Sequence, residues 1–175
     1  MNEQIIIVDN FYDEPFHYHK GFDKKECVIT DETIGKIEQI IGNPIRIVKA
    51  SNETQGISGV FAHLESDWTA VIYLSLPFES FGKTSVKLYS HISTGLESFP
   101  SEIEMKENNI TGENFNEMFD FDLKNWKEYF SIPAKYNRMV LFKSDRWHSY
   151  SSNTSIKYQK IIIKNNYSYF GGGII

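Results

Sequence analysis

Three side chains that can bind a metal stand at alternate positions in one short segment of the sequence. The stretch "GVFAHLESDWTAVIYLS" (residues 59–75) contains His63, Glu65 and Asp67 between two runs that are typical of strands. Side chains at positions i and i+2 of a strand leave the same face, so His63 and Glu65 can converge on one ion. The spacing therefore predicts part of a metal site, unless His63 is a core histidine beside an ordinary polar turn.

A second histidine follows an apolar strand much further along the chain. The segment "NRMVLFKSDRWHSYSS" (residues 137–152) leads to His148. Two ligands close together and one distant histidine are typical of the 2-His-1-carboxylate triad, which leaves open positions on Fe(II) for other ligands. His63, Glu65 and His148 fit this triad in type and order. Asp67 is the alternative carboxylate, but it is expected in a turn, so Glu65 is the preferred ligand.

The expected strand "IKYQKIIIK" (residues 156–164) offers a positive charge near the second histidine. An oxygenase that uses 2-oxoglutarate needs a cation for the carboxylate of this cosubstrate that lies away from the metal. Alternation places Lys157 on the face of two isoleucines and places Lys160 and Lys164 on the opposite face. We therefore expect Lys157 to point inward and the other two lysines to be solvated. Tyr73 is expected to reach the same carboxylate, unless it is only a core aromatic.

The composition is that of one globular domain spanning residues 1–175. Hydrophobic residues make up 41% of the 175 residues and aromatic residues 15%, which is enough for a sizeable core. The net charge of −5 argues against a nucleic-acid-binding face. We expect neither a membrane span nor a signal peptide, because no apolar run is long enough and the start lacks a basic segment. The single cysteine, Cys27, suits a reducing compartment, so a cytoplasmic location is expected.

A short helical front followed by many strands predicts a mainly β domain. Residues 31–41 carry isoleucines at helical spacing, and Gly42 and Pro44 end the expected helix. From residue 45 onward, β-branched and aromatic runs alternate with turn residues, which is typical of strands. One more helix is expected near 114–130, where apolar residues recur as a stripe. The pattern favours an antiparallel sandwich or barrel of the jelly-roll type with a small helical layer.

Four segments in this order resemble the non-haem Fe(II)/2-oxoglutarate-dependent oxygenases: "AHLESDWTAVIYLS", "FGKTSVKLY", "NRMVLFKSDRWHS" and "KYQKIII". The chain is most similar to the prolyl-hydroxylase-like branch and to a group of uncharacterised bacterial and phage relatives. The resemblance covers most of the chain and is weaker over residues 16–56 and 100–130. It implies a double-stranded β-helix, which is a cupin-like jelly-roll core.

By position, the resemblance implies that His63, Glu65 and His148 hold Fe(II) and that Tyr73 and Lys157 bind 2-oxoglutarate. It implies a dioxygenase reaction in which 2-oxoglutarate and O₂ yield succinate and CO₂ while a substrate is hydroxylated. The substrate is expected to be a peptidyl residue such as proline, or a small molecule. The family more often has Asp and Arg at the positions of Glu65 and Lys157.

Two other interpretations stay open. A cupin-like metal protein that does not use 2-oxoglutarate would have the same histidines, and in a catalytically silent jelly-roll binding module they would be core residues.

Residues 90–115, rich in Ser, Glu, Asn and Gly, are the expected substrate loop. The resemblance also matches Gly82 to the glycine after the "YL" strand. No nucleic-acid or membrane partner is expected, and the sequence does not specify an oligomeric state.

Overall fold

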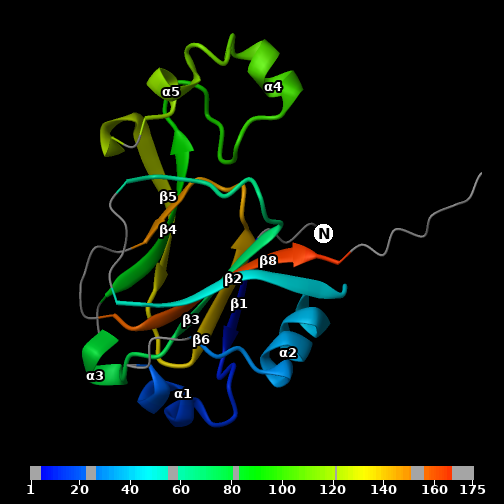
Figure 1. Ribbon diagram of the computed structural model, residues 1–175. Coiled ribbons are helices and arrows are strands. Elements are labelled where there is room, and N and C mark those ends of the chain that lie inside the picture. The colour runs from blue at the N-terminus through cyan, green and yellow to red at the C-terminus, as the bar shows by residue number, and fades with distance from the viewer. Residues whose placement is uncertain are drawn as a thin grey trace, which may run out of the picture.

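Two antiparallel β-sheets form the body of the protein (Figure 1). The structure, a computed structural model, describes residues 5–22, 27–54, 59–80, 83–120, 122–150 and 156–166. Hydrophobic side chains of both sheets pack together between them, and the longer N-terminal helices cover the outer face of the larger sheet. The expected mainly β, jelly-roll type of architecture is confirmed.

The larger sheet has five strands in the order β1-β6-β3-β8-β2, and every neighbouring pair is antiparallel. Its strands are β1 (Ile5–Asp9), β6 (Arg138–Lys143), β3 (Trp68–Tyr73), β8 (Tyr158–Asn165) and β2 (Ile45–Glu53). All six residues of β3 are buried, since this strand is covered on both faces. Its continuous apolar sequence, without alternation, follows from that double burial.

The smaller sheet has three strands in the order β5-β4-β7. These strands are β5 (Trp126–Pro133), β4 (Thr84–His91) and β7 (His148–Tyr150). The short helix α3 (Pro77–Ser80) lies between β3 and β4 in the chain. The smaller sheet therefore carries the second candidate histidine at the start of its edge strand β7.

Helices α1 (Pro15–Gly21) and α2 (Asp31–Ile41) lie against the larger sheet. The side chain of Thr30 accepts a hydrogen bond from the backbone N–H of Thr33 and so caps α2. Gly42 ends the helix with a φ of 77°, a left-handed conformation that favours glycine. The predicted helix over residues 31–41 is confirmed. Within the described residues, no helix is both long enough and apolar enough to span a membrane.

A lobe at the top of Figure 1 contains α4 (Glu102–Glu107), α5 (Phe115–Met118) and a short 3₁₀ helix, η1 (Leu123–Asn125). The expected helix near 114–130 is wrong, because α5 ends after one turn and β5 begins at Trp126. Pairing of β5 with β4 overrides the helical spacing of the apolar residues here. Phe115, Met118, Phe119 and Trp126 belong to the aromatic core of the lobe, whereas Leu123 and Phe130 are exposed.

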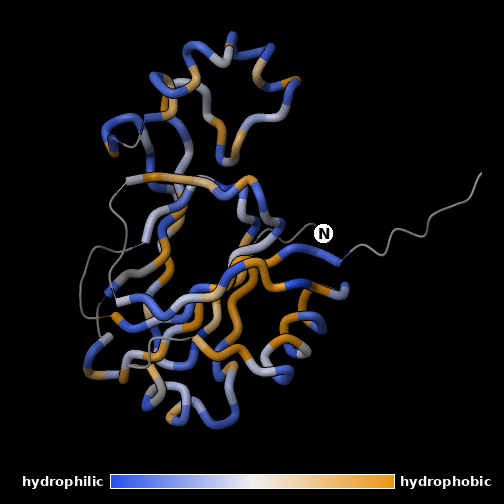
Figure 2. Tube along the Cα trace, viewed as in Figure 1, coloured by the Kyte–Doolittle hydropathy of each residue, from blue (hydrophilic) through white to orange (hydrophobic). Residues whose placement is uncertain are grey.

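The two faces of the larger sheet bury different sets of side chains. One face, with residues such as Leu141, Ile161 and Ile163, packs against α2. The other face, with residues such as Phe142 and Tyr158, packs against the smaller sheet. The apolar strands are seen at the centre of Figure 2, while the lobe and the surface loops are more hydrophilic. Alternate residues of one strand therefore face either the helices or the space between the two sheets.

Candidate metal centre

The fold brings the two predicted histidine ligands together. Phe61 and His148 exchange two backbone N–H···O=C hydrogen bonds of 2.9 Å each, so the segment before His63 lies alongside β7. The backbone N–H of His63 donates to the carbonyl oxygen of Ser144 at 2.7 Å. The imidazole ring centroids of His63 and His148 are 5.3 Å apart. This separation suits two ligands of a single ion.

The tautomer of His148 follows from its backbone contact. Nδ1 of this fully buried imidazole lies 2.7 Å from the carbonyl oxygen of Arg146. A carbonyl oxygen only accepts hydrogen bonds, so Nδ1 carries the proton and Nε2 keeps its lone pair. Burial lowers the pKa of His148 to about 3, and the nearby positive charges of His63 and Lys160 act in the same direction. At neutral pH the side chain is therefore in the form that binds a metal through Nε2.

His63 is neutral for the same main reason. Burial lowers its pKa to about 4, and the positive charges of Lys160 and Lys49 add to the effect. Nε2 of His63 and Nε2 of His148 are both buried, and neither has a hydrogen-bond partner among the described residues. A buried polar atom without a partner costs about 1–3 kcal/mol. A shared divalent ion would satisfy both atoms, so the two imidazoles fit the metal that the sequence predicts.

The carboxylates are placed differently. Glu65 is exposed on a bend next to His63, and the described ranges contain no cluster of three His, Cys, Asp or Glu side chains that could hold a metal. The structure thus unites His63 with His148 but does not bring Glu65 to them. Asp67 is engaged elsewhere, because its Oδ2 accepts the backbone N–H of Asn165 at 2.8 Å.

Aromatic rings pack next to the histidines in the interior between the two sheets. The ring of Phe61 lies 4.5 Å from that of His148, and the ring of Tyr150 lies 5.3 Å from it. The ring of Tyr158 stacks on that of Tyr150 with centroids 5.8 Å apart, and the ring of Tyr73 lies 6.4 Å from that of Tyr158. Tyr73, predicted to bind the cosubstrate, is fully buried in this same interior.

Lys160 belongs to the same side of the sheet as these aromatic rings. Its Nζ lies 4.8 Å from the ring centroid of Tyr150 and 5.6 Å from that of Phe61. Burial lowers the pKa of Lys160, and the charge of Glu53 opposes this shift. Within the described part of the chain, no carboxylate lies within salt-bridge distance of this ammonium group. Lys160 therefore brings a positive charge to the neighbourhood of the two imidazoles.

Lys157, the predicted anchor, lies on the other side of the larger sheet. Its Nζ is 5.7 Å from the ring centroid of Phe22, which belongs to the core beneath the helices. The expected alternation along β8 is present, but both faces of the strand are buried. The isoleucine face packs against the helices, whereas the face of Tyr158 and Lys160 meets the space between the sheets. The expectation that Lys160 is solvated differs from the structure, since this residue is half-buried.

Arg138, the first residue of β6, and Arg146, which lies between β6 and β7, use their side chains in ion pairs. Arg138 binds Asp9 with an N–O distance of 2.6 Å, and Arg146 binds Glu97 at 2.9 Å. Gly82, which the resemblance matches to a family glycine, lies outside the described residues. Lys160 is thus a better placed cation than either arginine for a ligand bound beside the imidazoles.

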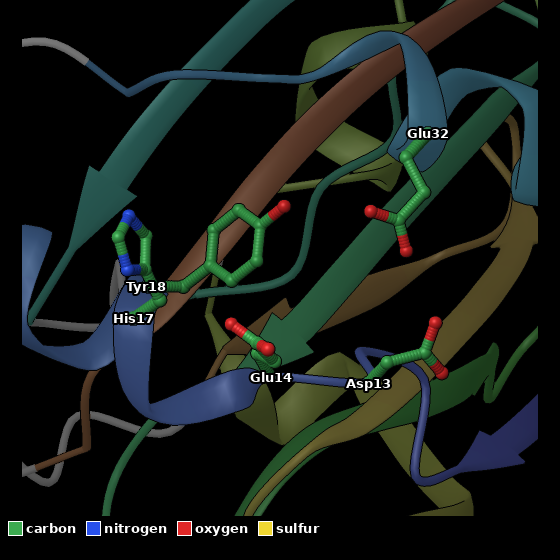
Figure 3. A pocket seen from close by; sticks show the side chains of 5 residues that line it. All are labelled: Asp13, Glu14, His17, Tyr18 and Glu32. Carbon is green, nitrogen blue, oxygen red and sulfur yellow. The ribbon is translucent and has the colours of Figure 1, made fainter.

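A cavity of about 370 Å³ lies on the helical side of the larger sheet, apart from the histidine pair (Figure 3). Three carboxylates, one imidazole and one phenol line it: Asp13, Glu14, His17, Tyr18 and Glu32. Lys36 already pairs with two of these carboxylates, at 3.0 Å from Asp13 and 2.8 Å from Glu32. The acidic lining is therefore partly neutralised by the protein itself.

No protein-family model matches the chain, and a comparison with curated proteins finds no match. Among solved structures, the chain is similar to the non-heme alpha ketoglutarate dependent epimerase SnoN from nogalamycin biosynthesis. The TM-score is 0.55 at 9% identity, over 93% of this chain and 78% of SnoN. SnoN in complex with Fe3+, alpha ketoglutarate and nogalamycin RO gives 0.52 at 10% identity, over 93% and 79%. HygX from Streptomyces hygroscopicus, with nickel and 2-oxoglutarate bound, gives 0.48 at 12% identity, over 94% and 84%. At these identities, the likeness to SnoN shows a shared fold.

Proposed function

We propose that the chain is an Fe(II)- and 2-oxoglutarate-dependent dioxygenase. The observation that carries this proposal is the pair of buried, neutral imidazoles of His63 and His148, each with an unpartnered Nε2 among the described residues. The fold supports it, because SnoN, with the same fold, is a non-heme alpha ketoglutarate dependent enzyme. The prolyl-hydroxylase-like branch is a finer part of the same proposal.

In this proposal, His63 and His148 hold Fe(II) through their Nε2 atoms. Bound Fe(II) would supply the activation of O₂: one oxygen atom enters succinate as CO₂ leaves 2-oxoglutarate, and the other enters a substrate C–H bond to give an alcohol. The carbonyl of Arg146 holds the proton of His148 on Nδ1, so that Nε2 stays available. Phe61 packs beside both imidazoles and limits the access of water.

Glu65 is the proposed third ligand of the metal. It lies on an exposed bend two residues after His63, and no hydrogen bond or ion pair within the described residues holds its carboxylate. Its movement toward the ion would therefore break no described interaction. Asp67 is the weaker candidate, because its side chain already accepts a backbone N–H.

Lys160 is the proposed cation for the remote carboxylate of 2-oxoglutarate, in preference to Lys157. The support is its position over the ring of Tyr150, on the side of the sheet where the histidines lie. Tyr73 is buried in the same interior and remains a proposed second contact. A half-buried cation is favoured when an anion accompanies it, which fits a dicarboxylate cosubstrate.

The proposed substrate is a peptidyl residue such as proline, or a small molecule. Residues 90–115, which include α4, are the proposed substrate loop because exposed connecting segments commonly carry recognition residues. Measuring succinate release against panels of peptides and amino acids identifies the substrate class. Release that depends on one panel member supports the assignment of that class.

The reaction class is tested by adding Fe(II) and then 2-oxoglutarate to the protein without oxygen. A weak visible charge-transfer band is expected from iron chelated by the cosubstrate, and it should be lost in His63→Ala and His148→Ala. Iron binding without such a band would favour a cupin-like metal protein that does not use 2-oxoglutarate. This second function is considered because, within the described residues, no third ligand joins His63 and His148. No iron binding at all would leave a silent binding module.

A further inference from the structure

An extra residue in strand β2 changes which of its side chains face the candidate metal centre. Val48 has no pairing partner in β8, because Ile47 lies opposite Ile163 and the next paired residue of β2 is Lys49. Ile47 and Ile163 both pack in the core beneath the helices. A bulge of this kind adds one residue to one strand only and so shifts the alternation of side chains by one position. Lys49 therefore lies on the opposite face of the sheet from Ile47.

The face that β2 presents after this bulge is the one that meets the smaller sheet. Ser51 lies opposite Lys160, and Glu53 lies opposite Tyr158, which belongs to the core between the two sheets. Directly opposite residues of an antiparallel pair share a face, and so do alternate residues of one strand. Lys49, Ser51 and Glu53 are therefore polar residues on the interior side of β2.

Lys49 is placed close to the candidate metal centre. It is a diagonal neighbour of Lys160 across the two strands, and such neighbours lie about 7–8 Å apart. Nζ of Lys160 is 5.6 Å from the ring centroid of Phe61, and this ring lies 5.5 Å from that of His63. Burial and the charge of Lys160 lower the pKa of His63, and the charge of Lys49 adds to this effect. The ammonium group of Lys49 thus acts on the imidazole.

The charges on this face of β2 and β8 do not balance. Glu53 accepts a hydrogen bond of 2.7 Å from Ser51, and its charge raises the pKa of Lys160 against the larger effect of burial. In the part of the chain that the structure describes, no carboxylate lies within salt-bridge distance of Lys49, which is exposed. Lys160 is the proposed partner of the cosubstrate, which leaves Lys49 for a different anion.

We infer that Lys49 is a substrate-binding residue, whose ammonium group pairs with an oxyanion group of the substrate, a carboxylate or a phosphate. This inference rests on the proposed function and deepens it, because it selects small acids from the two proposed substrate classes. Lys49 lies so close to the histidines that the oxyanion and the reacting carbon belong to one small molecule. A proline within a peptide chain has no charged group of its own for Lys49 to bind.

The test uses pairs of compounds that differ in charge at one group. N-acetyl amino acids are paired with their amides, and sugar phosphates with the free sugars, so that carboxylate and phosphate are separate arms. Each compound is titrated calorimetrically into protein loaded with Ni(II) and 2-oxoglutarate. In at least one pair, the charged member should bind the parent about 10- to 100-fold more tightly than the neutral member. The arm that contains this pair identifies the oxyanion.

Variants of Lys49 assign this preference to its side chain. Lys49→Met should weaken binding of the charged member about 10- to 100-fold and leave the affinity for 2-oxoglutarate unchanged. Lys49→Arg should retain the preference, because a guanidinium group also binds oxyanions. Lys20→Met is the control for the lost charge, because Lys20 is exposed on α1, on the helical side of the larger sheet. It should behave like the parent.

Three results overturn the inference and leave the proposed function intact. The first is that no charged member binds the parent better than its neutral counterpart. The second is that Lys49→Met weakens binding of 2-oxoglutarate instead, which would place the lysine in the cosubstrate site. The third is self-association of Lys49→Met with unchanged affinities, since a lysine on an edge strand also discourages pairing with another chain. If the Ni(II)-loaded parent does not bind 2-oxoglutarate, the proposed function itself fails, and the inference fails with it.

Discussion

Nδ1 of His148 lies 2.7 Å from the carbonyl oxygen of Arg146, two residues earlier in the chain. This contact commits one side of the imidazole to the protein and leaves the other side for a ligand. The partner ring of His63 is 5.3 Å away and equally lacks a described partner for Nε2. Both rings therefore present an Nε2 without a described partner, as the proposed metal site requires.

Replacing either imidazole should abolish metal binding. His63→Ala or His148→Ala should weaken Fe(II) binding by more than the roughly 10- to 100-fold loss seen when a supporting residue of a metal ligand is removed. Anaerobic titration measures the affinity, and circular dichroism checks the fold. His17→Ala is the control, because His17 is exposed and lies on α1, apart from the histidine pair. Unchanged iron binding in both site variants would exclude this pair as the metal ligands.

Glu65 and Asp67 should respond to loss of charge in opposite ways. Glu65→Gln should weaken metal binding and change the free energy of unfolding by less than about 0.5 kcal/mol, because the side chain is exposed. Asp67→Asn should retain metal binding but lower the free energy of unfolding by about 1–3 kcal/mol, because Oδ2 accepts the N–H of Asn165. Metal titration and urea unfolding of both variants measure these effects. The reverse result would make Asp67 the ligand.

Lys157, which directly precedes β8, and Lys160, within this strand, should differ in their effect on the cosubstrate. Lys160→Met should raise the 2-oxoglutarate concentration needed for half-maximal binding about a hundredfold, since the lost charge is partly buried. Lys157→Met, on the helical side, should change it little. Calorimetric titration of the Ni(II)-loaded variants measures both. A larger effect of Lys157→Met would support the anchor expected from the sequence instead.

The metal-free protein should lose stability as the pH falls below about 6.5. His148 has a pKa of about 3 in the folded protein and an ordinary value of 6.5 when unfolded, so below pH 6.5 the unfolded chain binds more protons. From pH 7 to pH 5 this histidine alone should lower the free energy of unfolding by about 2 kcal/mol. Urea unfolding with a chelator present measures the change. His148→Gln should show a smaller pH dependence than the parent. An unchanged slope in His148→Gln would show that His148 is not held neutral.

Much of the scaffold follows from local sequence patterns. Isoleucine spacing, a capping threonine and Gly42 define α2 without any distant contact. The apolar runs that became β3 and β6 are equally clear, and they frame the segments that carry His63 and His148. The pairing of these two histidines could therefore be expected from residue type and order.

The placement of Glu65 and Lys160 depends on information that local patterns lack. The i, i+2 argument for Glu65 requires a strand, but the chain bends at Leu64 and Glu65, so the two side chains do not share a face. For β8, alternation separates Lys157 from Lys160 correctly. It does not reveal which face meets the smaller sheet, because both faces are buried. In the sequence, the aromatic residue Tyr158 indicates which face of this strand points to the interior between the two sheets.

The strand order has a consequence for how this protein folds. In the order β1-β6-β3-β8-β2, none of the first three strands of the chain is paired with another, because β6 and β8 lie between them. A nascent chain whose synthesis has not yet reached Arg138, the first residue of β6, therefore cannot form the larger sheet from β1, β2 and β3 alone. Long-range pairing of this kind slows folding and leaves strand edges open in the meantime. During synthesis, the facing edges of β2 and β3 should thus stay unpaired until β8 is inserted between them.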